Sequence, residues 1–118
     1  MLTKILRIRK VLLGKDFFAY TQHITPKLNL GNAGANFTIA TQLLNDSSIV
    51  YSFGVGTDIS FDIALIEKYK VSIFAFDPTP KSINWIKSQK LPTQFKFYEF
   101  GLADYDGLAD FNPPENPD

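Results

Sequence analysis

The chain has 118 residues with a formal net charge of zero, 45% hydrophobic residues and no cysteine. This length suits one globular domain, and the zero net charge gives no general attraction to nucleic acid. The absence of cysteine excludes disulfides and thiolate metal sites, and we predict no metal centre.

The N-terminal segment, residues 1–45, is predicted to form an arm of a helix and loops. Residues 2–13 place apolar side chains at helical spacing opposite basic ones, and Gly14 can end this helix. We interpret the helix as a packing element in preference to a contact with a membrane surface or an acidic partner. Three aromatic residues are predicted to anchor the arm on the domain: Phe17, Phe18 and Tyr20.

The second part of the arm contains the only histidine, His23, which is more typical of a structural residue than of a general base. Residues 29–36 have turn chemistry and predict a loop. This loop is either a lid over a ligand or an ordinary connection. Residues 39–44 favour a short helix before the turn at residues 45–48.

Residues 49–62 combine an apolar run of strand length, two glycines in three residues and the start of a helix. The pattern predicts strand 49–53, a tight turn at Gly54 and Gly56, and a helix with Ile59, Ile63 and Ile66 on its inner face. Glycines let a ligand approach the backbone closely, and the first turn of a helix presents unpaired N–H groups. The stretch is therefore a candidate cradle for a small molecule.

The rest of the chain continues the alternation of strands and helices. The predicted elements are a strand at 71–76 that ends at Asp77, a helix at 80–89 with Thr79 as N-cap, a strand at 95–100, a turn at 104–107 and a short strand at 108–111. Alternating β and α elements predict an α/β fold with a parallel sheet in residues 46–118.

Asp77 follows the strand next to the glycine turn and lies 23 residues after Gly54. At this place in an open parallel sheet, a carboxylate can accept both hydroxyls of an adenosine ribose. Two cofactor classes satisfy this geometry, a dinucleotide such as NAD and S-adenosylmethionine. A third interpretation gives the glycines only a turn and Asp77 only a capping role.

The start of the helix after the glycines favours S-adenosylmethionine. Asp58 and Asp62 bracket it. At about 5 Å and an effective dielectric of about 20, each carboxylate would oppose a phosphate charge by about 3 kcal/mol, whereas it tolerates a sulfonium or an ammonium. Ile59 also occupies the third glycine position of the dinucleotide fingerprint.

Three sequence blocks resemble the front half of an FkbM-family methyltransferase across roughly residues 40–115. The blocks are YSFGVGTDISFD at 51–62, AFDPTPKSI at 75–83, and GLAD at 101–104 with DG at 106–107. The resemblance implies a three-layer Rossmann-like fold of the class I methyltransferase type that binds S-adenosylmethionine. It also implies methyl transfer to a hydroxyl of a small molecule or sugar.

Carried over by position, the resemblance places the methionine part of the cofactor on the glycine turn, the ribose on Asp77 and the adenine near residues 102–104. The implied cofactor-binding residues are Gly54, Val55, Gly56, Asp58, Asp77, Pro78, Leu102, Ala103 and Asp104. Ser52 and Asp58 depart from the usual pattern, which has an acid and a third glycine there. Asp58 is expected to contact the amino group of the ligand.

The chain is shorter than the domain it resembles, so we expect an incomplete sheet. The strand at 49–53 would then have an open apolar edge, which favours self-association. No catalytic residue can be nominated. Alternatives to the methyltransferase are a dinucleotide-binding domain and a non-catalytic remnant or interaction module. Apolar runs shorter than a bilayer span and the lack of a signal-peptide pattern predict a cytoplasmic protein with no transmembrane segment.

Overall fold

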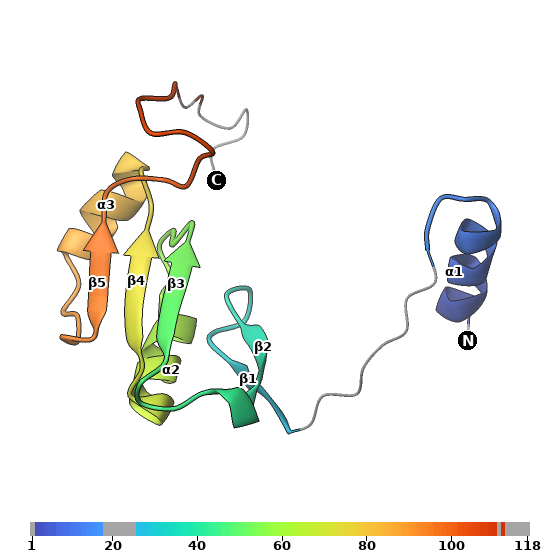
Figure 1. The fold of residues 1–118 in the computed structure, drawn as a ribbon, viewed down its shortest axis with the longest axis horizontal. Coiled ribbons are helices and arrows are strands. Elements are labelled where there is room, and N and C mark those ends of the chain that lie inside the picture. The colour runs from blue at the N-terminus through green and yellow to red at the C-terminus, as the bar shows by residue number, and fades with distance from the viewer. Residues whose placement is uncertain (1, 18–25, 111, 113–118) are drawn as a thin grey trace.

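The computed structural model describes residues 2–17, 26–110 and 112 of the chain (Figure 1). The elements are α1 (Leu2–Leu12), β1 (Lys27–Leu30), β2 (Phe37–Ala40), a 3₁₀ turn (Thr41–Leu43), β3 (Ile49–Phe53), α2 (Ser60–Tyr69), β4 (Ser72–Phe76), α3 (Pro80–Lys87) and β5 (Phe95–Tyr98). The predicted α/β class is confirmed.

The central sheet has the strand order β3-β4-β5, and both pairs of neighbouring strands are parallel. Its register places Ser52 beside Ala75, and Ala75 beside Phe97. The carboxyl ends of the three strands therefore lie at one edge, where β3 and β4 each continue into a helix. The predicted parallel sheet is confirmed.

The helix after β3 ends just before a residue in left-handed conformation, and the helix after β4 begins at a proline. Helix α2 ends at Tyr69, and the next residue, Lys70, adopts a left-handed conformation (φ 59°) and donates its N–H to the Ile66 carbonyl. Helix α3 begins at Pro80, directly after Thr79 in extended conformation. Proline suits this first position because its missing N–H would have had no partner inside the helix.

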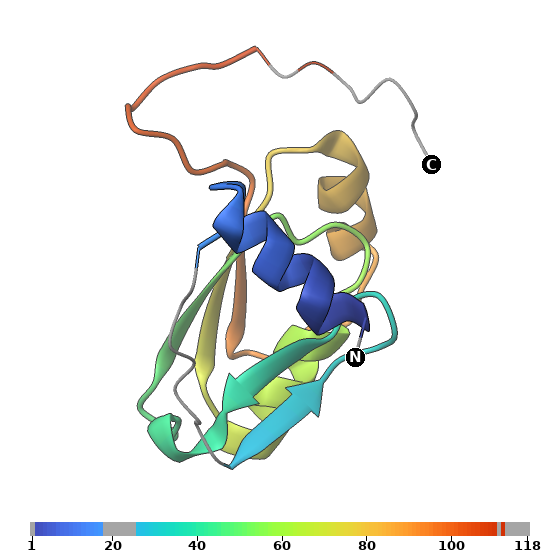
Figure 2. The same ribbon diagram turned by 90° about the vertical axis from the view of Figure 1, so that its right-hand side faces the viewer.

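One face of the sheet forms the core. Ile73 and Ala75 of β4 are fully buried, and they belong to the same cluster as Leu65 of α2 and Ile86 of α3. Figure 2 shows both helices on the same side of the sheet. The expectation of three layers is therefore not met by the described residues, which form two.

The opposite face of the sheet is aromatic and open. The Phe76 ring stacks between Phe53 and Tyr98, with ring centroids 5.0 Å and 5.1 Å away. Tyr51 on the edge strand β3 is 61% exposed. Within the described residues β3 pairs only with β4, so the open apolar edge agrees with expectation. Self-association through it stays a prediction.

The arm contains a β-hairpin that the sequence did not suggest. Strands β1 and β2 pair antiparallel, with Leu28 opposite Ile39. The predicted helix at 39–44 is wrong, because its first two residues end strand β2 and residues 41–43 form the 3₁₀ turn. The predicted loop at 29–36 is shorter, since residue 29 and Leu30 belong to β1.

The hairpin packs against the core beside α2, through Leu30 and Ile39 (Figure 1). The division of the chain at residues 45 and 46 stays a prediction. Helix α1 confirms the predicted N-terminal helix. It stands apart from the sheet and hairpin, so its interpretation as a packing element is not met by the described residues. Phe17 is 73% exposed, so it anchors nothing there, while Phe18, Tyr20 and His23 lie outside the described residues.

Beyond β5, which is two residues shorter than predicted, the chain has no further strand as far as residue 110. The expected strand at 108–111 is wrong for its first three residues, and Phe111 lies outside the described part. Leu108 is fully exposed, so no packing stabilises a strand there. Among the described helices, none has the length and apolar character required to cross a bilayer.

Candidate functional site

The turn between β3 and α2 is built on two glycines in left-handed conformation. Gly54 has φ 72° and Gly56 has φ 63°, values that other residues adopt with strain. A Cβ added to either glycine would meet no atom within 4 Å. The backbone of this turn therefore borders open space, which is the condition for close approach of a ligand.

Several N–H groups of the turn already donate to partners in the chain. Gly54 N–H donates to the Phe76 carbonyl (3.0 Å), Gly56 N–H to Asp77 Oδ2 (2.9 Å) and Ser60 N–H to Asp58 Oδ1 (2.8 Å). A phosphate bound at a glycine-rich turn requires such groups as donors. The N–H groups of Gly54, Gly56 and Ser60 are therefore not free to bind an anion.

Asp58 ties the start of α2 to the hairpin loop. Besides the bond from Ser60 N–H, its Oδ2 accepts from Asn32 Nδ2 (3.2 Å), and Asn32 N–H donates to Ser60 Oγ (2.7 Å). The side-chain hydrogen bond of Ser60 is the largest cause that lowers the pKa of the exposed Asp58 carboxyl. The predicted loop between β1 and β2 thus lies directly against the glycine turn.

Asp77 lies at the end of β4 and is 4% exposed. Its Oδ2 accepts from Gly56 N–H, while its Oδ1 accepts from Thr79 N–H (2.9 Å) and Thr79 Oγ1 (2.7 Å). Burial acts to raise the pKa of Asp77, but the hydrogen bonds from Gly56, Thr79 and Ser82 outweigh it, and the pKa is lowered. The carboxylate fastens the two strand-to-helix connections to each other.

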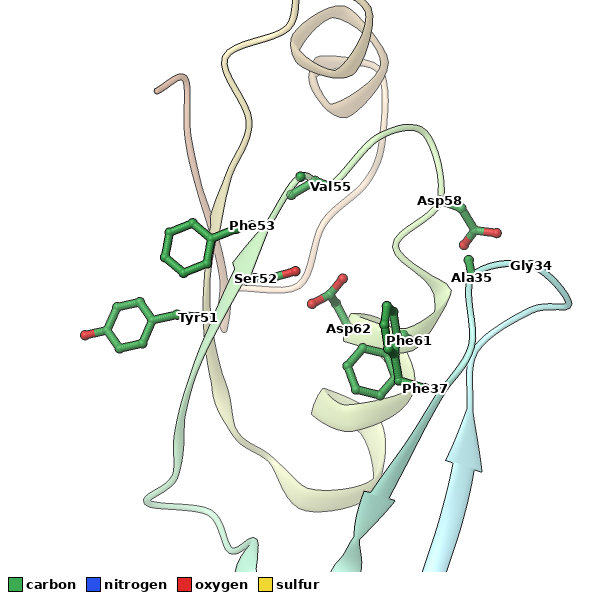
Figure 3. Close-up of a pocket in the computed structure, with 11 residues that line it drawn as sticks. Gly34, Ala35, Phe37, Tyr51, Ser52, Phe53, Val55, Asp58, Phe61 and Asp62 are labelled. Atoms are coloured by element: carbon green, nitrogen blue, oxygen red, sulfur yellow. The ribbon is translucent and has the colours of Figure 1, made fainter. Parts of the chain in front are cut away.

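Asp62, in the first turn of α2, is 5% exposed and is bound very differently. Its Oδ1 is buried and accepts no hydrogen bond from the described residues. Burial raises the pKa of Asp62, and a hydrogen bond from the Ser52 side chain opposes part of this rise. Figure 3 shows the Ser52 hydroxyl pointing toward the Asp62 carboxylate.

A cavity of about 430 Å³ opens beside the glycine turn, between β3, α2 and the hairpin (Figure 3). Its lining residues are Gly34, Ala35, Phe37, Tyr51, Ser52, Phe53, Gly54, Val55, Asp58, Phe61 and Asp62. The Phe37 and Phe61 rings, whose centroids are 5.0 Å apart, form its apolar wall. The charged groups in this lining are two carboxylates, and the lining contains no lysine, arginine or histidine.

The predicted cofactor residues fall into three groups. Gly54, Val55 and Asp58 line the cavity. Gly56 and Asp77 lie next to it and are hydrogen-bonded to each other. Pro78 is exposed next to Asp77, and a Cβ on Gly101 would lie 3.4 Å from its Cγ.

The predicted adenine-flanking residues are not brought into this cavity. Leu102 is 75% exposed, and Ala103 and Asp104 are also exposed. They belong to the segment after β5 that leaves the sheet in Figure 1. Their contact with a ligand stays a prediction.

Two residues of the site were absent from the predicted set, the buried Asp62 and its neighbour Ser52. Helical spacing contains a signal for Asp62, which lies three residues after Ile59 and four before Ile66, on the apolar face of α2. The hairpin residues Phe37 and Asn32 had no comparable signal.

The acids around the turn lack a basic partner in the described part of the chain. The ion pairs found there join Arg7 to Asp16 and Lys87 to Glu99, away from the turn. The described residues also contain no cluster of three histidine, cysteine or acidic side chains arranged to hold a metal ion. The site is therefore a partly apolar hollow with uncompensated negative charge.

Comparison of the chain with protein-family models, with curated proteins and with solved structures found no match in any of the three.

Proposed function

We propose that this chain carries the cofactor-binding part of an S-adenosylmethionine-dependent methyltransferase of the FkbM type. The observation that supports this best is the negative charge around the glycine turn. Asp58 and Asp62 line the cavity and Asp77 binds the Gly56 N–H, and none of the three forms an ion pair with a basic side chain of the described residues. Such a site favours a cationic ligand, and S-adenosylmethionine carries both a sulfonium and an ammonium.

The same geometry argues against a dinucleotide. A pyrophosphate needs N–H donors at the turn, and those of Gly54, Gly56 and Ser60 are already used within the chain. Each nearby carboxylate adds a repulsion of about 3 kcal/mol at about 5 Å in a medium of effective dielectric about 20. NAD is therefore the less favoured of the two ligands.

The cavity size is compatible with part of such a ligand. Small-molecule sites commonly measure about 300–1,000 Å³ and combine apolar walls with a few polar groups. The 430 Å³ hollow matches this description, because its lining includes the Phe37 and Phe61 rings and the carboxylates of Asp58 and Asp62. We assign the amino-acid end of the cofactor to this cavity and the ribose to the neighbourhood of Asp77.

The proposed reaction transfers a methyl group to a hydroxyl of a small molecule or sugar. The bond from sulfur to the methyl carbon breaks, its electron pair stays on sulfur to give S-adenosylhomocysteine, and the acceptor oxygen forms the new bond as it loses its proton. This displacement requires an aligned acceptor and a base. We assign neither among the described residues.

Side-by-side calorimetric titrations with S-adenosylmethionine, S-adenosylhomocysteine and NAD test the proposal. We expect both adenosyl compounds to bind and NAD to bind at least tenfold more weakly. A matched control is Asp46→Asn, which removes an exposed acid from the turn before β3 and should leave all affinities unchanged. Tighter binding of NAD, or no binding of either adenosyl compound at millimolar concentration, would overturn the proposal.

A further inference from the structure

Asp62 Oδ1 is a buried charged atom without a hydrogen-bond partner among the described residues. The side chain is 5% exposed, so water does not solvate it freely. Buried polar atoms in folded proteins nearly always have a partner, and an orphaned carboxylate oxygen destabilises the fold. Such an atom is a candidate contact for a ligand.

The surroundings of Asp62 describe the missing partner. The carboxylate lines the 430 Å³ cavity next to the Phe61 ring, and the Ser52 hydroxyl points toward it from β3 (Figure 3). No basic side chain is among the residues that line this cavity, so the lining supplies no counter-charge. The partner must be cationic, must donate hydrogen bonds and must enter from the cavity.

We propose, building on the proposed function, that the Asp62 carboxylate receives the primary ammonium of the amino-acid part of S-adenosylmethionine. Oδ1 has almost no accessible surface, so a rotation of the Asp62 carboxylate must accompany binding. An ammonium offers three N–H donors and a full positive charge, so one of its hydrogen bonds then satisfies this oxygen. The Ser52 hydroxyl points toward this carboxylate and is placed to orient it.

Other cations fit these surroundings less well. A sulfonium has no N–H group and cannot satisfy the hydrogen bond that Oδ1 lacks. A metal ion requires several ligands, and the described residues contain no group of three suitable side chains. Asp58, the second acid of the cavity, is exposed and already accepts from Ser60 and Asn32.

Two analogues of S-adenosylhomocysteine test this assignment on the unmodified protein. The deaminated analogue has hydrogen in place of the amino group, and the decarboxylated analogue keeps the amine but lacks the carboxylate. We expect the deaminated analogue to bind at least tenfold more weakly than S-adenosylhomocysteine. The decarboxylated analogue should bind no more weakly, because no basic group lines the cavity.

The variant Asp62→Asn tests whether Asp62 is the residue that recognises the amino group. It should weaken S-adenosylhomocysteine about tenfold and leave the affinity for the deaminated analogue unchanged, which is the signature of a direct pairwise contact. Ser52→Ala should give a smaller loss of about two- to fivefold with the same ligand dependence. Asp46→Asn is the matched control without effect, and thermal melting verifies that each variant is folded.

The outcomes separate this assignment from the proposed function. If the wild-type protein binds S-adenosylhomocysteine but does not discriminate against the deaminated analogue, the assignment of the ammonium is wrong and the proposed function stands. The assignment is also overturned if Asp62→Asn weakens the binding of S-adenosylhomocysteine and of the deaminated analogue equally, since the residue would then act through the fold. If the wild-type protein binds no adenosyl compound, both proposals are overturned together. The comparison of ligands on the wild-type protein decides the question even if a variant fails to fold.

Discussion

The unit of β3 and α2 and the unit of β4 and α3 each bury one aspartate, Asp62 in the first turn of α2 and Asp77 at the end of β4, and they use the two carboxylates in different ways. Asp77, after β4, accepts hydrogen bonds from Gly56 and Thr79 with both oxygens, and its pKa is lowered. Asp62, after β3, keeps one buried oxygen without a partner in the described residues, and its pKa is raised.

The difference separates a structural role from a binding role. A carboxylate whose oxygens are bound inside the chain contributes to stability, and a ligand must share or displace those bonds. A carboxylate left unsatisfied beside a cavity destabilises the ligand-free protein but is ready to bind a cation. One buried carboxylate thus stabilises the strand-to-helix connections, and the other is available to a ligand.

The largest expected effect follows from the removal of Asp77. Asp77→Ala leaves the N–H groups of Gly56 and Thr79 without their acceptor, and both lie in the connections that the carboxylate fastens together. Loss of charged hydrogen bonds of this kind costs about 3 kcal/mol, which lowers the melting temperature by about 10–20 °C in a domain of this size. Circular dichroism during thermal and urea unfolding measures this loss.

The control for this measurement is Asp46→Ala, which removes an exposed acid and should change stability by less than about 0.5 kcal/mol. If Asp77→Ala melts like this control, the hydrogen bonds of Asp77 do not hold the two connections together. Asp77 would then have no structural role to set against the binding role of Asp62.

The second effect has the opposite sign. Asp62→Asn replaces a buried charge by a neutral amide of the same shape, and an orphaned amide atom costs less than an orphaned carboxylate oxygen. We expect the ligand-free variant to be more stable than the wild-type protein by about 1 kcal/mol at neutral pH. A lower melting temperature for Asp62→Asn would show that the carboxylate has a stabilising partner, and the binding role would be contradicted.

The central strands and helices could be predicted because their sequences carry local signals. The glycine turn, the Thr79 and Pro80 pair and the apolar runs of β3 and β4 each specify one element. The hairpin could not be predicted, because strands of four residues contain too little alternation to be distinguished from a loop or a helix. Its stability comes from contacts of Leu30 and Ile39 with a core that is distant in the sequence.

The candidate site was only partly predictable for a related reason. Sequence identifies Gly54, Gly56, Asp58 and Asp77 as neighbours of a turn, but it does not say which carboxylates find partners. That depends on Thr79 folding back onto Asp77, and on the absence of a donor for Asp62 Oδ1 in the described residues. Residues 102–104 extend away from the sheet, so their position could not be inferred from order along the chain.

The pH dependence of stability distinguishes the two aspartates further. A lowered pKa means that the contribution of Asp77 is present above the unfolded value of about 4 and disappears as the pH falls through the folded value. A raised pKa means that Asp62 contributes stability below about 4 that is lost as the pH rises through its folded value.

The stability gap between wild type and Asp77→Ala should therefore shrink below pH 4, and the gap between wild type and Asp62→Asn should grow above it. Denaturant melts across this range measure both gaps. The neighbouring Asp58 is present in every variant, so its contribution to the pH dependence of stability cancels from these differences. Gaps that do not change with pH would contradict the assigned directions.

The smallest effects come from the serines beside each aspartate. Ser52→Ala removes a hydrogen bond to Asp62, and Ser82→Ala removes one to Asp77 together with the bond between Ser82 Oγ and Thr79 Oγ1 (2.8 Å). Each loss should cost about 0.5 kcal/mol at neutral pH. The two costs should fade at different acidities, because each bond weakens when its own carboxylate is protonated. The cost of Ser52→Ala should decline at a higher pH, where Asp62 takes up its proton, and that of Ser82→Ala only below about pH 4. Parallel melts of the two variants across this pH range measure this order. If the two costs decline at the same pH, the environments of Asp62 and Asp77 do not differ in the way their hydrogen bonds indicate.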